Sequence, residues 1–415
     1  ASSAFTDVNR GYIITGNNTL NGTLSIAANT PVRIGGVPGN ADANLLGADS
    51  FGSLGSASVA NEGTLTFSRL DAHTVTNVIS GAGNLRVGLP SIAALGNTST
   101  QVVTYNAVGT WTGTMSINNG TMIVPSAAIA GAGDISIEST GTLQLDGQAG
   151  ALTKLLTVQT GGTLRGSGST ASDVIVNGAI APGSSTGIFT STAVVDFNSS
   201  SIYQWDAANW SGTTAGTDWD LISADQLNLN AVDGTDLVIV IGAGVSGFAE
   251  SNKTFRIASA ATALSGFDVT AITIDATAFA TATGALGTWA VQQNGNNLDL
   301  VYTANTDPYN TWAAARGLSG GAAAVDADPD SDGINNLLEF ALATEPNPAN
   351  QNSQSQGALP TPVISGTNLI FTHRLADAAA ALSRHVQYSS DLTAWIDSAN
   401  GTNGVTVVVT DDFYG

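Results

Sequence analysis

The sequence predicts a mainly β protein that begins with a parallel β-helix, a solenoid in which each coil stacks on the one before it. Three observations predict this fold. Short strand patterns recur after Gly-Thr or a near equivalent, no helical pattern lies between them, and the distance between copies is irregular. Short strands with turns on every side suit stacked coils, whereas a meander of hairpins would show steadier spacing. A β-sandwich built from the same strands is the alternative.

Each copy of the strand pattern places a glycine at a turn and then alternates apolar and polar residues. In the copy at 140–145, Leu143 and Leu145 share one face while Gln144 points away, which is the period of a half-buried strand. Asn-Gly and Gly-Gly pairs supply the positive φ angles of the turns. The copies are NGTLSI (21–26), EGTLTF (62–67), AGNLRV (82–87), TGTMSI (112–117), NGTMIV (119–124), AGDISI (132–137), TGTLQL (140–145), GGTLRG (161–166) and the weaker NGAIAP (177–182).

The composition agrees with a solenoid and argues against several classes of function. Only 6% of the 415 residues are aromatic and 10% are charged, as expected for a core of stacked small aliphatic side chains. Eleven Lys and Arg against 32 Asp and Glu give a net charge of −21, which argues against nucleic acid and anionic membrane surfaces as partners. Without cysteine there is no disulfide and no thiolate chemistry. The sequence contains no apolar run of about 18 residues, so no transmembrane segment is predicted.

Residues 1–187 are therefore predicted to be the β-helix, and residues 188–304 an antiparallel β region that caps it. From about residue 188 onward tryptophan and tyrosine become frequent and the apolar strands become longer. The open end of a solenoid exposes unpaired strand edges, so it needs such a cap. The predicted strands of the cap lie at 237–242, 253–259, 288–293 and 296–303.

The segment 305–346 is predicted to be a helix–calcium loop–helix, and to be the only helical part of the chain. TWAAARGL follows Asn310, a plausible N-cap, and INNLLEFALATEP forms a second helix that ends before Pro346. The apolar face of the second helix is expected to hold Ile334, Leu337, Leu338, Ala341 and Leu342. Residues 347–415 are predicted to form a small β module, with a polar loop at 347–361 and strands at 369–375, 385–391, 393–397 and 405–410.

The strongest chemical signal is an acidic loop that starts at Asp328. It fits the calcium-binding pattern D-x-[DN]-x-[DN]-G-x5-E without a gap. Calcium takes about six to eight oxygen ligands, and carboxylates at alternate loop positions converge on one point while the glycine makes a sharp turn. A solvated acidic loop without metal is the alternative, but its carboxylates would repel one another. The predicted ligands are Asp328, Asp330, Asp332, the Ile334 carbonyl, Asn336 and Glu339, with Asp326 as an additional candidate.

Three other patterns carry weaker signals. A G-x-G-x-x-G pattern lies at 242–247, but a strand rather than a helix follows it, so a dinucleotide site is not expected. Asp218 and Asp220 flank Trp219 and would share one face of a strand, which makes a glycosidase pair one interpretation; a structural edge with a buried Trp219 is the favoured one. The histidines have no zinc-binding or triad spacing: His73, His373 and His385.

The run from GGTLRGSG to TDWDLI (161–222) resembles autotransporter-associated β-strand repeat proteins. Those proteins share G-T-L-x-G-x-G, N-G-x-x-x-P-G-x-S-x-G, a Y-x-W/F strand and a T-D-x-D-x-L step, and the upstream repeats at 79–88 and 111–124 match as well. The resemblance covers roughly residues 10–303. The segment from TWAAARGL to TEPN is similar to the part that follows such repeats in large surface proteins of Verrucomicrobia-like and Planctomycetes-like bacteria, with a calcium loop similar to those of thrombospondin type 3 repeats and dockerins.

The resemblance implies secretion, a β-helical passenger and a structural role at a cell surface or in a matrix, without enzyme activity. No membrane β-barrel pattern and no sorting segment follow in this sequence, and the opening residues would suit a product of signal-peptide cleavage. We expect an extracellular, self-assembling subunit of a filament, sheath or matrix. A monomeric adhesin is the alternative, and binding of surface glycans through Trp205, Trp210 or Trp219 would fit either. A β-helix polysaccharide lyase or hydrolase is disfavoured by the scarcity of Lys and Arg.

Overall fold

The chain divides into two compact units, Ala1–Ala304 and Asn305–Gly415. Most of the regular structure is β-strand, and the predicted mainly β fold with a large parallel sheet is confirmed. The computed structural model describes residues 6–7, 11–14, 16, 18–35, 52–69, 71–88, 101–127, 129–151, 153–305, 307–344, 359–372, 376–379, 386–389 and 393–398.

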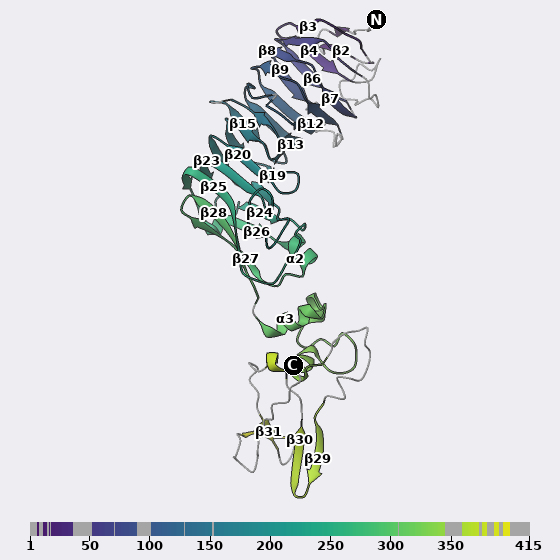
Figure 1. The fold of residues 1–415 in the computed structure, drawn as a ribbon, viewed down its shortest axis with the longest axis vertical. Helices are drawn as coiled ribbons and strands as arrows, with labels where there is room; N and C mark the ends of the chain where they lie inside the picture. The colour runs from purple at the N-terminus through teal and green to yellow at the C-terminus, as the bar shows by residue number, and fades with distance from the viewer. Residues whose placement is uncertain are drawn as a thin grey trace. The chain divides into compact units, whose positions relative to one another are not determined.

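The first unit is a parallel β-helix in which strands of successive coils lie side by side along three columns (Figure 1). The first column contains β2 (Gly11–Ile14), β4 (Pro31–Ile34), β6 (Thr64–Phe67), β9 (Asn84–Val87), the first halves of β12 (Met115–Val124) and β13 (Ile135–Leu145), β15 (Leu155–Val158), β18 (Asp173–Val176), β21 (Val194–Phe197), and the ends of β23 (Leu221–Leu229) and β25 (Lys253–Ser265). The second column contains β7 (Ala72–Val75), β10 (Val102–Tyr105), the second halves of β12 and β13, β16 (Thr163–Gly166), β19 (Ala179–Pro182), β22 (Ile202–Trp205), β24 (Leu237–Ile241) and β26 (Ile272–Asp275).

The third column ends in an antiparallel hairpin. Its strands are β3 (Thr23–Ile26), β5 (Ser58–Asn61), β8 (Ile79–Gly81), β11 (Thr110–Trp111), β14 (Gln148–Ala149), β17 (Ser169–Thr170), β20 (Ile188–Ser191) and the first parts of β23 and β25. β28 (Asn297–Thr303) then pairs antiparallel with β25, and β27 (Thr288–Asn294) pairs antiparallel with β28. At the N-terminal end, β1 (Thr6–Asp7) pairs antiparallel with β2.

The core of the solenoid is built from aliphatic side chains that stack from coil to coil. Parallel register places one inward residue directly above the next, about 4.8 Å away, so each buried side chain contacts its equivalents on both neighbouring coils. Methyl-rich residues of similar size fill this space, which explains why the first part of the chain needs few aromatic residues. One such stack runs along the first column through Leu65, Leu85, Met115, Ile135, Leu156, Val174, Val195, Leu227 and Leu264, all buried.

The parallel solenoid continues well beyond residue 187, so the predicted start of the antiparallel region at 188 is wrong. β20 to β26 all pair in parallel with the coil before them, and only β27 and β28 form the antiparallel cap. The change at 188 is one of coil length. Hydrogen-bonded residues on successive coils are 21 positions apart at Asn177 and Asn198, but 32 apart at Asp196 and Asn228. Trp205 lies on the parallel strand β22, and Trp210 and Trp219 lie in the loops inserted after it, so these tryptophans did not signal a new sheet.

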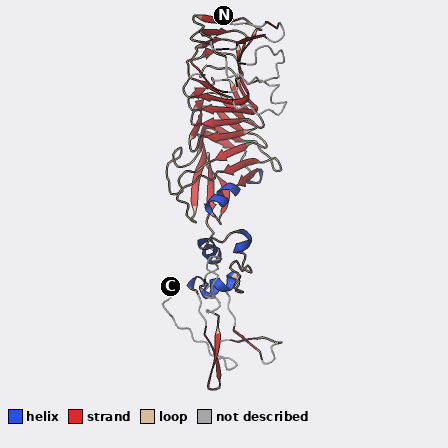
Figure 2. Ribbon diagram, turned by 90° about the vertical axis from the view of Figure 1, so that its right-hand side faces the viewer, coloured by secondary structure: helices blue, strands red, loops and turns tan. Residues whose placement is uncertain are grey.

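Those inserted loops cover a cluster of aromatic rings at the C-terminal end of the solenoid. Trp210 lies at its centre, with ring-centroid distances of 4.8 Å to Phe248, 5.8 Å to Phe279 and 5.2 Å to Tyr302. Phe279 belongs to α2 (Thr277–Thr283), a helix outside the segment 305–346 that was predicted to hold all helices (Figure 2). The sequence TAFATAT has weak helical propensity, and burial of Phe279 supplies the stabilisation.

The second unit contains the two expected helices around a small aromatic core. α3 (Pro308–Ala315) begins at Asp307, whose side chain accepts the Tyr309 N–H, so Asp307 and not Asn310 is the N-cap. α4 (Asn336–Leu342) has Asn335 as its N-cap. The core contains Tyr309, Trp312, Ala313, Leu318, Phe340 and Ala379.

The predicted apolar face of the second helix is only partly correct. Ile334 and Leu342 are buried, but Leu337 and Leu338 are 37% and 39% exposed. The helix has only seven residues, and its buried side begins with Asn336 rather than with a leucine. The helix therefore faces the core through a different side than its hydrophobic spacing indicated.

Short antiparallel hairpins complete the described part of the second unit. β29 (Thr361–Ser365) pairs with β30 (Asn368–Thr372), and β31 (Val386–Tyr388) pairs with β32 (Ile396–Ser398). β29 includes the end of the predicted polar loop, whereas β30, β31 and β32 overlap predicted strands. The predicted strand at 405–410 lies outside the described residues. Single-turn 3-10 helices occur at η1 (Val269–Ala271), η2 (Gly320–Ala323) and η4 (Asp377–Ala379).

Candidate metal centre

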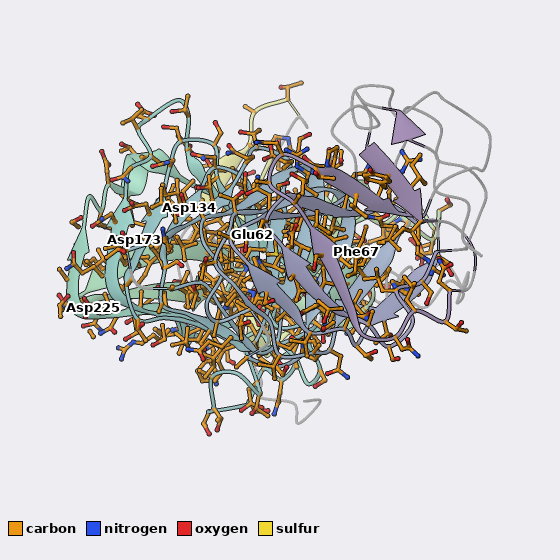
Figure 3. The ribbon with its side chains drawn as sticks, turned by 90° about the horizontal axis from the view of Figure 1, so that it is seen from above. Glu62, Phe67, Asp134, Asp173 and Asp225 are labelled. Atoms are coloured by element: carbon orange, nitrogen blue, oxygen red, sulfur yellow. The ribbon has the colours of Figure 1, made fainter. Side chains whose placement is uncertain are left out.

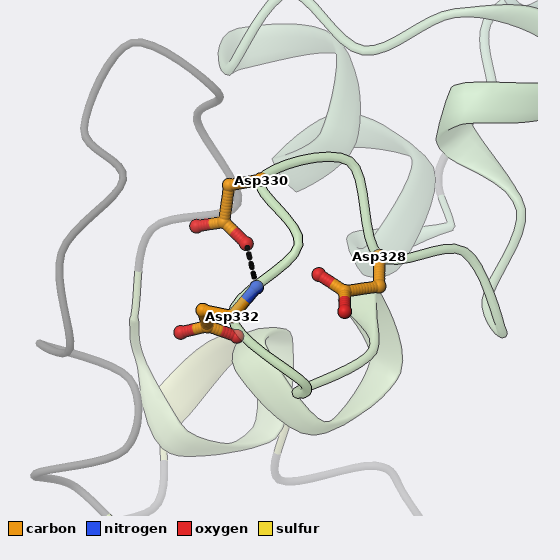
Figure 4. Close-up of side chains that lie close together, drawn as sticks. All are labelled: Asp328, Asp330 and Asp332. Atoms are coloured by element: carbon orange, nitrogen blue, oxygen red, sulfur yellow. Dashed lines mark hydrogen bonds between the residues drawn. The ribbon is translucent and has the colours of Figure 1, made fainter.

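The acidic loop between η2 and α4 brings three carboxylates together (Figure 4). One oxygen from each of Asp328, Asp330 and Asp332 lies within 4.8 Å of the others. The Gly333 N–H donates to Asp328 Oδ2 (2.9 Å), and the Asp332 N–H donates to Asp330 Oδ1 (3.3 Å). Gly333 has a φ of 90°, in keeping with the sharp turn that a calcium-type loop requires. Three of the predicted ligands are thus held by the loop's own backbone.

The three carboxylates have the chemistry of a site for a hard cation. Asp330 is 4% exposed, and Asp328 Oδ1 is buried without a hydrogen-bond partner. A buried carboxylate oxygen is strongly disfavoured unless a donor or a cation faces it. Arg316 is the one basic side chain that the structure describes in this unit, and it lies over the Trp312 ring at 4.9 Å. An all-oxygen donor set suits a hard metal ion, so the residues present fit one.

The pKa shift of Asp330 also favours a bound cation at this site. Burial raises the pKa of Asp330, the nearby carboxylates of Asp332 and Asp328 raise it further, and only the Asp332 N–H lowers it. A cation would favour the ionised carboxylate and offset these effects. Protons and a metal ion therefore compete for the same oxygens.

The remaining predicted ligands lie outside this group of three. Asp326 is exposed. The Ile334 N–H donates to Asp332 Oδ1 (2.9 Å), which places Ile334 on the rim of the loop. Glu339 is fully buried on α4, and its backbone carbonyl accepts the Thr344 N–H (2.9 Å). The structure therefore brings the first three acidic positions together and leaves the fourth acid on the neighbouring helix.

Asn336, another predicted ligand, ties the loop to the segment before it. Its Nδ2 donates to the carbonyls of Ala322 and Ala324, both at 2.8 Å. The side chain is fully buried, and its Oδ1 has no hydrogen-bond partner in the structure. The Tyr309 hydroxyl of α3 donates to the adjacent Ala323 carbonyl (3.0 Å), so α3 is hydrogen-bonded to the same segment, 322–324. Asn336 thus links the acidic loop to the core of the unit.

The carboxylates of Asp218 and Asp220 do not form a glycosidase pair. Asp218 accepts backbone N–H groups of its own loop, including that of Thr214 (2.9 Å), which lowers its pKa. Asp220 is 1% exposed and accepts the N–H of Gly187 (2.8 Å) and of Asp206 (2.9 Å). Burial raises the pKa of Asp220 to about 8, against the opposing effect of these hydrogen bonds. A sugar in solvent cannot reach a carboxylate in this position.

The tryptophans considered for glycan binding belong to the solenoid's interior or its packing. Trp205 is fully buried and Trp210 is 3% exposed. Trp219 is half-buried, and its Nε1 donates to the Arg256 carbonyl (3.0 Å). The ring faces of Trp205 and Trp210 are therefore not available for stacking on a sugar, and the preference for a structural role of this segment agrees with the packing.

The other weak motifs also have structural roles where they are described. His73 lies on β7 beside Phe67, with ring centroids 6.2 Å apart, and burial lowers its pKa. His373 and His385 lie outside the described residues. The glycines at 242–247 lead from β24 through a loop into β25, so no helix follows them, as expected.

Carboxylates along the solenoid accept hydrogen bonds from the backbone of the following coil, a role that the sequence did not reveal. Figure 3 labels three of these acids: Glu62, Asp134 and Asp173. The bonded residues are 20 or 21 positions apart, which is one coil of the regular part. Several of these acids lie directly before a strand or open it, and acids at that position are the signal that could have revealed them. The bonds run from Ala82 N–H to Glu62 (3.4 Å), Leu155 N–H to Asp134 (3.2 Å), Ser167 N–H to Asp146 (3.4 Å) and Val194 N–H to Asp173 (3.2 Å).

Comparison with known proteins assigns the chain to no family. No family model matches the sequence, and no curated protein matches it. In the described part of the structure, no helix is both long and apolar enough to cross a membrane.

Proposed function

We propose that this chain is a non-enzymatic structural protein of the bacterial cell surface or extracellular matrix, ordered by calcium and able to self-assemble. One observation carries the structural role: acidic side chains of the solenoid accept hydrogen bonds from the backbone of the adjacent coil. Asp134 and Asp173 each accept a backbone N–H of the next coil, and among the described residues neither belongs to the group of acids that could hold a metal ion. Carboxylates used in this way strengthen a rod, which is what a filament, sheath or matrix requires.

The metal in this proposal is calcium. The three clustered aspartates offer only oxygen, in a loop that turns at Gly333, and calcium accepts irregular oxygen sets more readily than magnesium does. Glu339 lies on the helix that follows the loop, fully buried, and it would complete the site if that helix moved toward the loop upon binding. The calcium ion would supply a positive charge beside Asp328 Oδ1, which is buried without a hydrogen-bond partner.

Calcium dependence is tested by thermal unfolding of the full chain. Because an ion that binds only the folded state stabilises it by mass action, calcium should raise the melting temperature and EDTA should lower it. Asp330→Asn should abolish the calcium effect, since it removes a central ligand charge. Asp233→Asn, at an exposed position in the first unit, is the control and should respond to calcium like the native chain. Equal melting temperatures in calcium and EDTA would refute the assignment.

The assembly state is tested by negative-stain microscopy and sedimentation of the native chain in calcium. Ordered oligomers or filaments are expected for a structural subunit. A chain that stays monomeric at all accessible concentrations would instead favour the monomeric adhesin.

A further inference from the structure

We propose that the edge strand β27 is a self-association site, through which two copies of this chain pair antiparallel about a two-fold axis. The proposal rests on the proposed self-assembly and names one surface that contributes a pairwise contact to it. β27 (Thr288–Asn294) is the last strand of the third column, beyond β25 and β28.

One edge of β27 is fully paired and the other is open. All seven residues pair with β28 in unbroken register from Thr288↔Thr303 to Asn294↔Asn297. Within the described residues, β28 is the one strand that forms a ladder with β27; β26 lies close to β27 but pairs with β24, and no hydrogen bond joins the outward backbone groups of 288–293 to another segment. A strand edge of this kind presents a row of N–H and C=O groups to any strand that can align with it.

The strand is held rigidly, so the edge is ready for pairing. Val291 is 5% exposed, and Trp289 packs against Tyr302 with ring centroids 4.9 Å apart. The strand therefore cannot twist away from a partner, and little conformational entropy is lost when a partner binds. The alternate residues Thr288, Ala290 and Gln292 point outward and are exposed.

The distribution of charge favours a second copy of this chain as the partner of β27. The chain has a net charge of −21, so two copies can approach closely only where carboxylates are absent. β27 reads TWAVQQN and contains neither a charge nor a proline, the usual devices that protect an edge. The neighbouring strand β26 ends in the exposed Asp275, which adds a negative charge at that edge. An antiparallel pair of β27 strands with Val291 near the axis would place Ala290 opposite Gln292, without repulsion.

The test uses sedimentation of the full chain in calcium from about 1 μM to about 1 mM, the range expected for a short strand pair. The native chain should show a concentration-dependent monomer–dimer equilibrium. The double variant Ala290→Glu, Gln292→Glu should weaken dimerisation at least tenfold, because like charges would face each other across the axis. The control, Gln148→Glu with Gln204→Glu, adds the same charge at exposed solenoid positions and should dimerise nearly as well as the native chain. An unchanged melting temperature verifies that each variant is folded.

The outcomes separate the edge from the general proposal. A native chain that remains monomeric at about 1 mM overturns both self-assembly and the role of β27. A dimer that survives the β27 substitutions, or that weakens equally in the control, leaves self-assembly intact and overturns the role of this edge. A polymer that the β27 substitutions abolish overturns the two-fold pairing, because only an open-ended contact propagates.

Discussion

At the scale of single residues, buried polar groups form hydrogen bonds between coils that depend on particular side chains, whereas the aliphatic core depends mainly on side-chain volume. Asp220 joins the N–H of Gly187 on one coil to the N–H of Asp206 at the start of an inserted loop. The Trp205 indole N–H donates to the Asp220 carbonyl (3.0 Å), so the same residue also fixes a core ring. The aliphatic stacks would tolerate exchanges of similar volume, whereas these contacts require a particular acceptor at a particular place.

Replacing Asp220 should therefore destabilise the first unit. Asp220→Ala leaves two buried N–H groups without an acceptor, and we expect a loss of about 2–4 kcal/mol in the free energy of unfolding. Asp233→Ala, at an exposed site, should change it by less than about 0.5 kcal/mol. Urea unfolding monitored by tryptophan fluorescence measures both. Equal effects of the two substitutions would contradict the role assigned to Asp220.

Asp220 should also make stability depend on pH. Its pKa is raised by burial from 3.8 to about 8, so between these values the folded chain keeps a proton that the unfolded chain releases. Stability should accordingly fall as pH rises from about 4 to about 8, by at most about 1.4 kcal/mol per pH unit from this group. The Asp220→Asn variant cannot ionise at this position and should lose this contribution. Parallel pH profiles for the native chain and the Asp220→Asn variant in urea unfolding would contradict it.

At the scale of elements, the coils are packed so closely that some turns admit only glycine. Gly147 precedes β14, and a Cβ atom there would lie 2.0 Å from the Ser126 carbonyl oxygen of the previous coil. Gly244 lies in the loop after β24 and has open space around it. The Gly-Thr turn at Gly141 is similarly close, with its Cβ position 2.2 Å from the Ile117 carbonyl oxygen, so this turn also marks a place where coils approach through their backbones.

Gly147 and Gly244 give a matched prediction. Gly147→Ala should destabilise the first unit by about 1–3 kcal/mol, because backbone on the neighbouring coil must move. Gly244→Ala should be neutral or stabilising by up to about 1 kcal/mol, because it only restricts the unfolded chain. Thermal unfolding distinguishes them, and a neutral Gly147→Ala would show that the coils separate easily.

In the second unit, the element that decides the position of the acidic loop is α4. Asn336→Leu removes the donor to the Ala322 and Ala324 carbonyls, and we expect a loss of about 1–3 kcal/mol together with weaker calcium binding. Leu337→Ala, on the exposed side of the same helix, should cost much less. Calorimetric titration with calcium and thermal unfolding report the two effects. If Asn336→Leu bound calcium as the native chain does, the hydrogen bonds from Asn336 to the Ala322 and Ala324 carbonyls would not position the loop.

At the scale of the whole molecule, the chain consists of two units with separate cores. The aliphatic stacks and the aromatic cluster belong to residues before Asn305, and the core around Tyr309 and Phe340 belongs to residues after it. The candidate metal centre lies entirely in the second unit. Each unit should therefore unfold by itself, and only one of them should sense the metal ion.

A truncated chain tests this independence. Residues 1–304 alone should unfold at the same temperature as the first unit of the full chain, in calcium and in EDTA alike. In the full chain, EDTA should shift only the transition of the second unit. Differential scanning calorimetry resolves the two transitions. A shift of the solenoid transition in EDTA would mean that the metal also stabilises the first unit.

The sequence by itself determined the β-helix and the clustering of Asp328, Asp330 and Asp332. Both are local properties. Alternation within a strand, glycine at a turn and acids at alternate positions of a loop act over a few residues, and they hold wherever the segment lies. Repetition then made stacking the favoured solution for the strand patterns.

Only the tertiary structure decided where the solenoid ends, which side of α4 is buried and what Asp220 does. The coils after 188 pair in parallel as the earlier ones do, and each pairing is a contact between residues that are 21 positions apart in one coil and 32 apart in another. Leu337 and Leu338 lie outside because the Asn336 amide turns the short helix toward Ala322 and Ala324. Hydrogen bonds and burial between distant segments set these features, and no local pattern in the chain records which segments will meet.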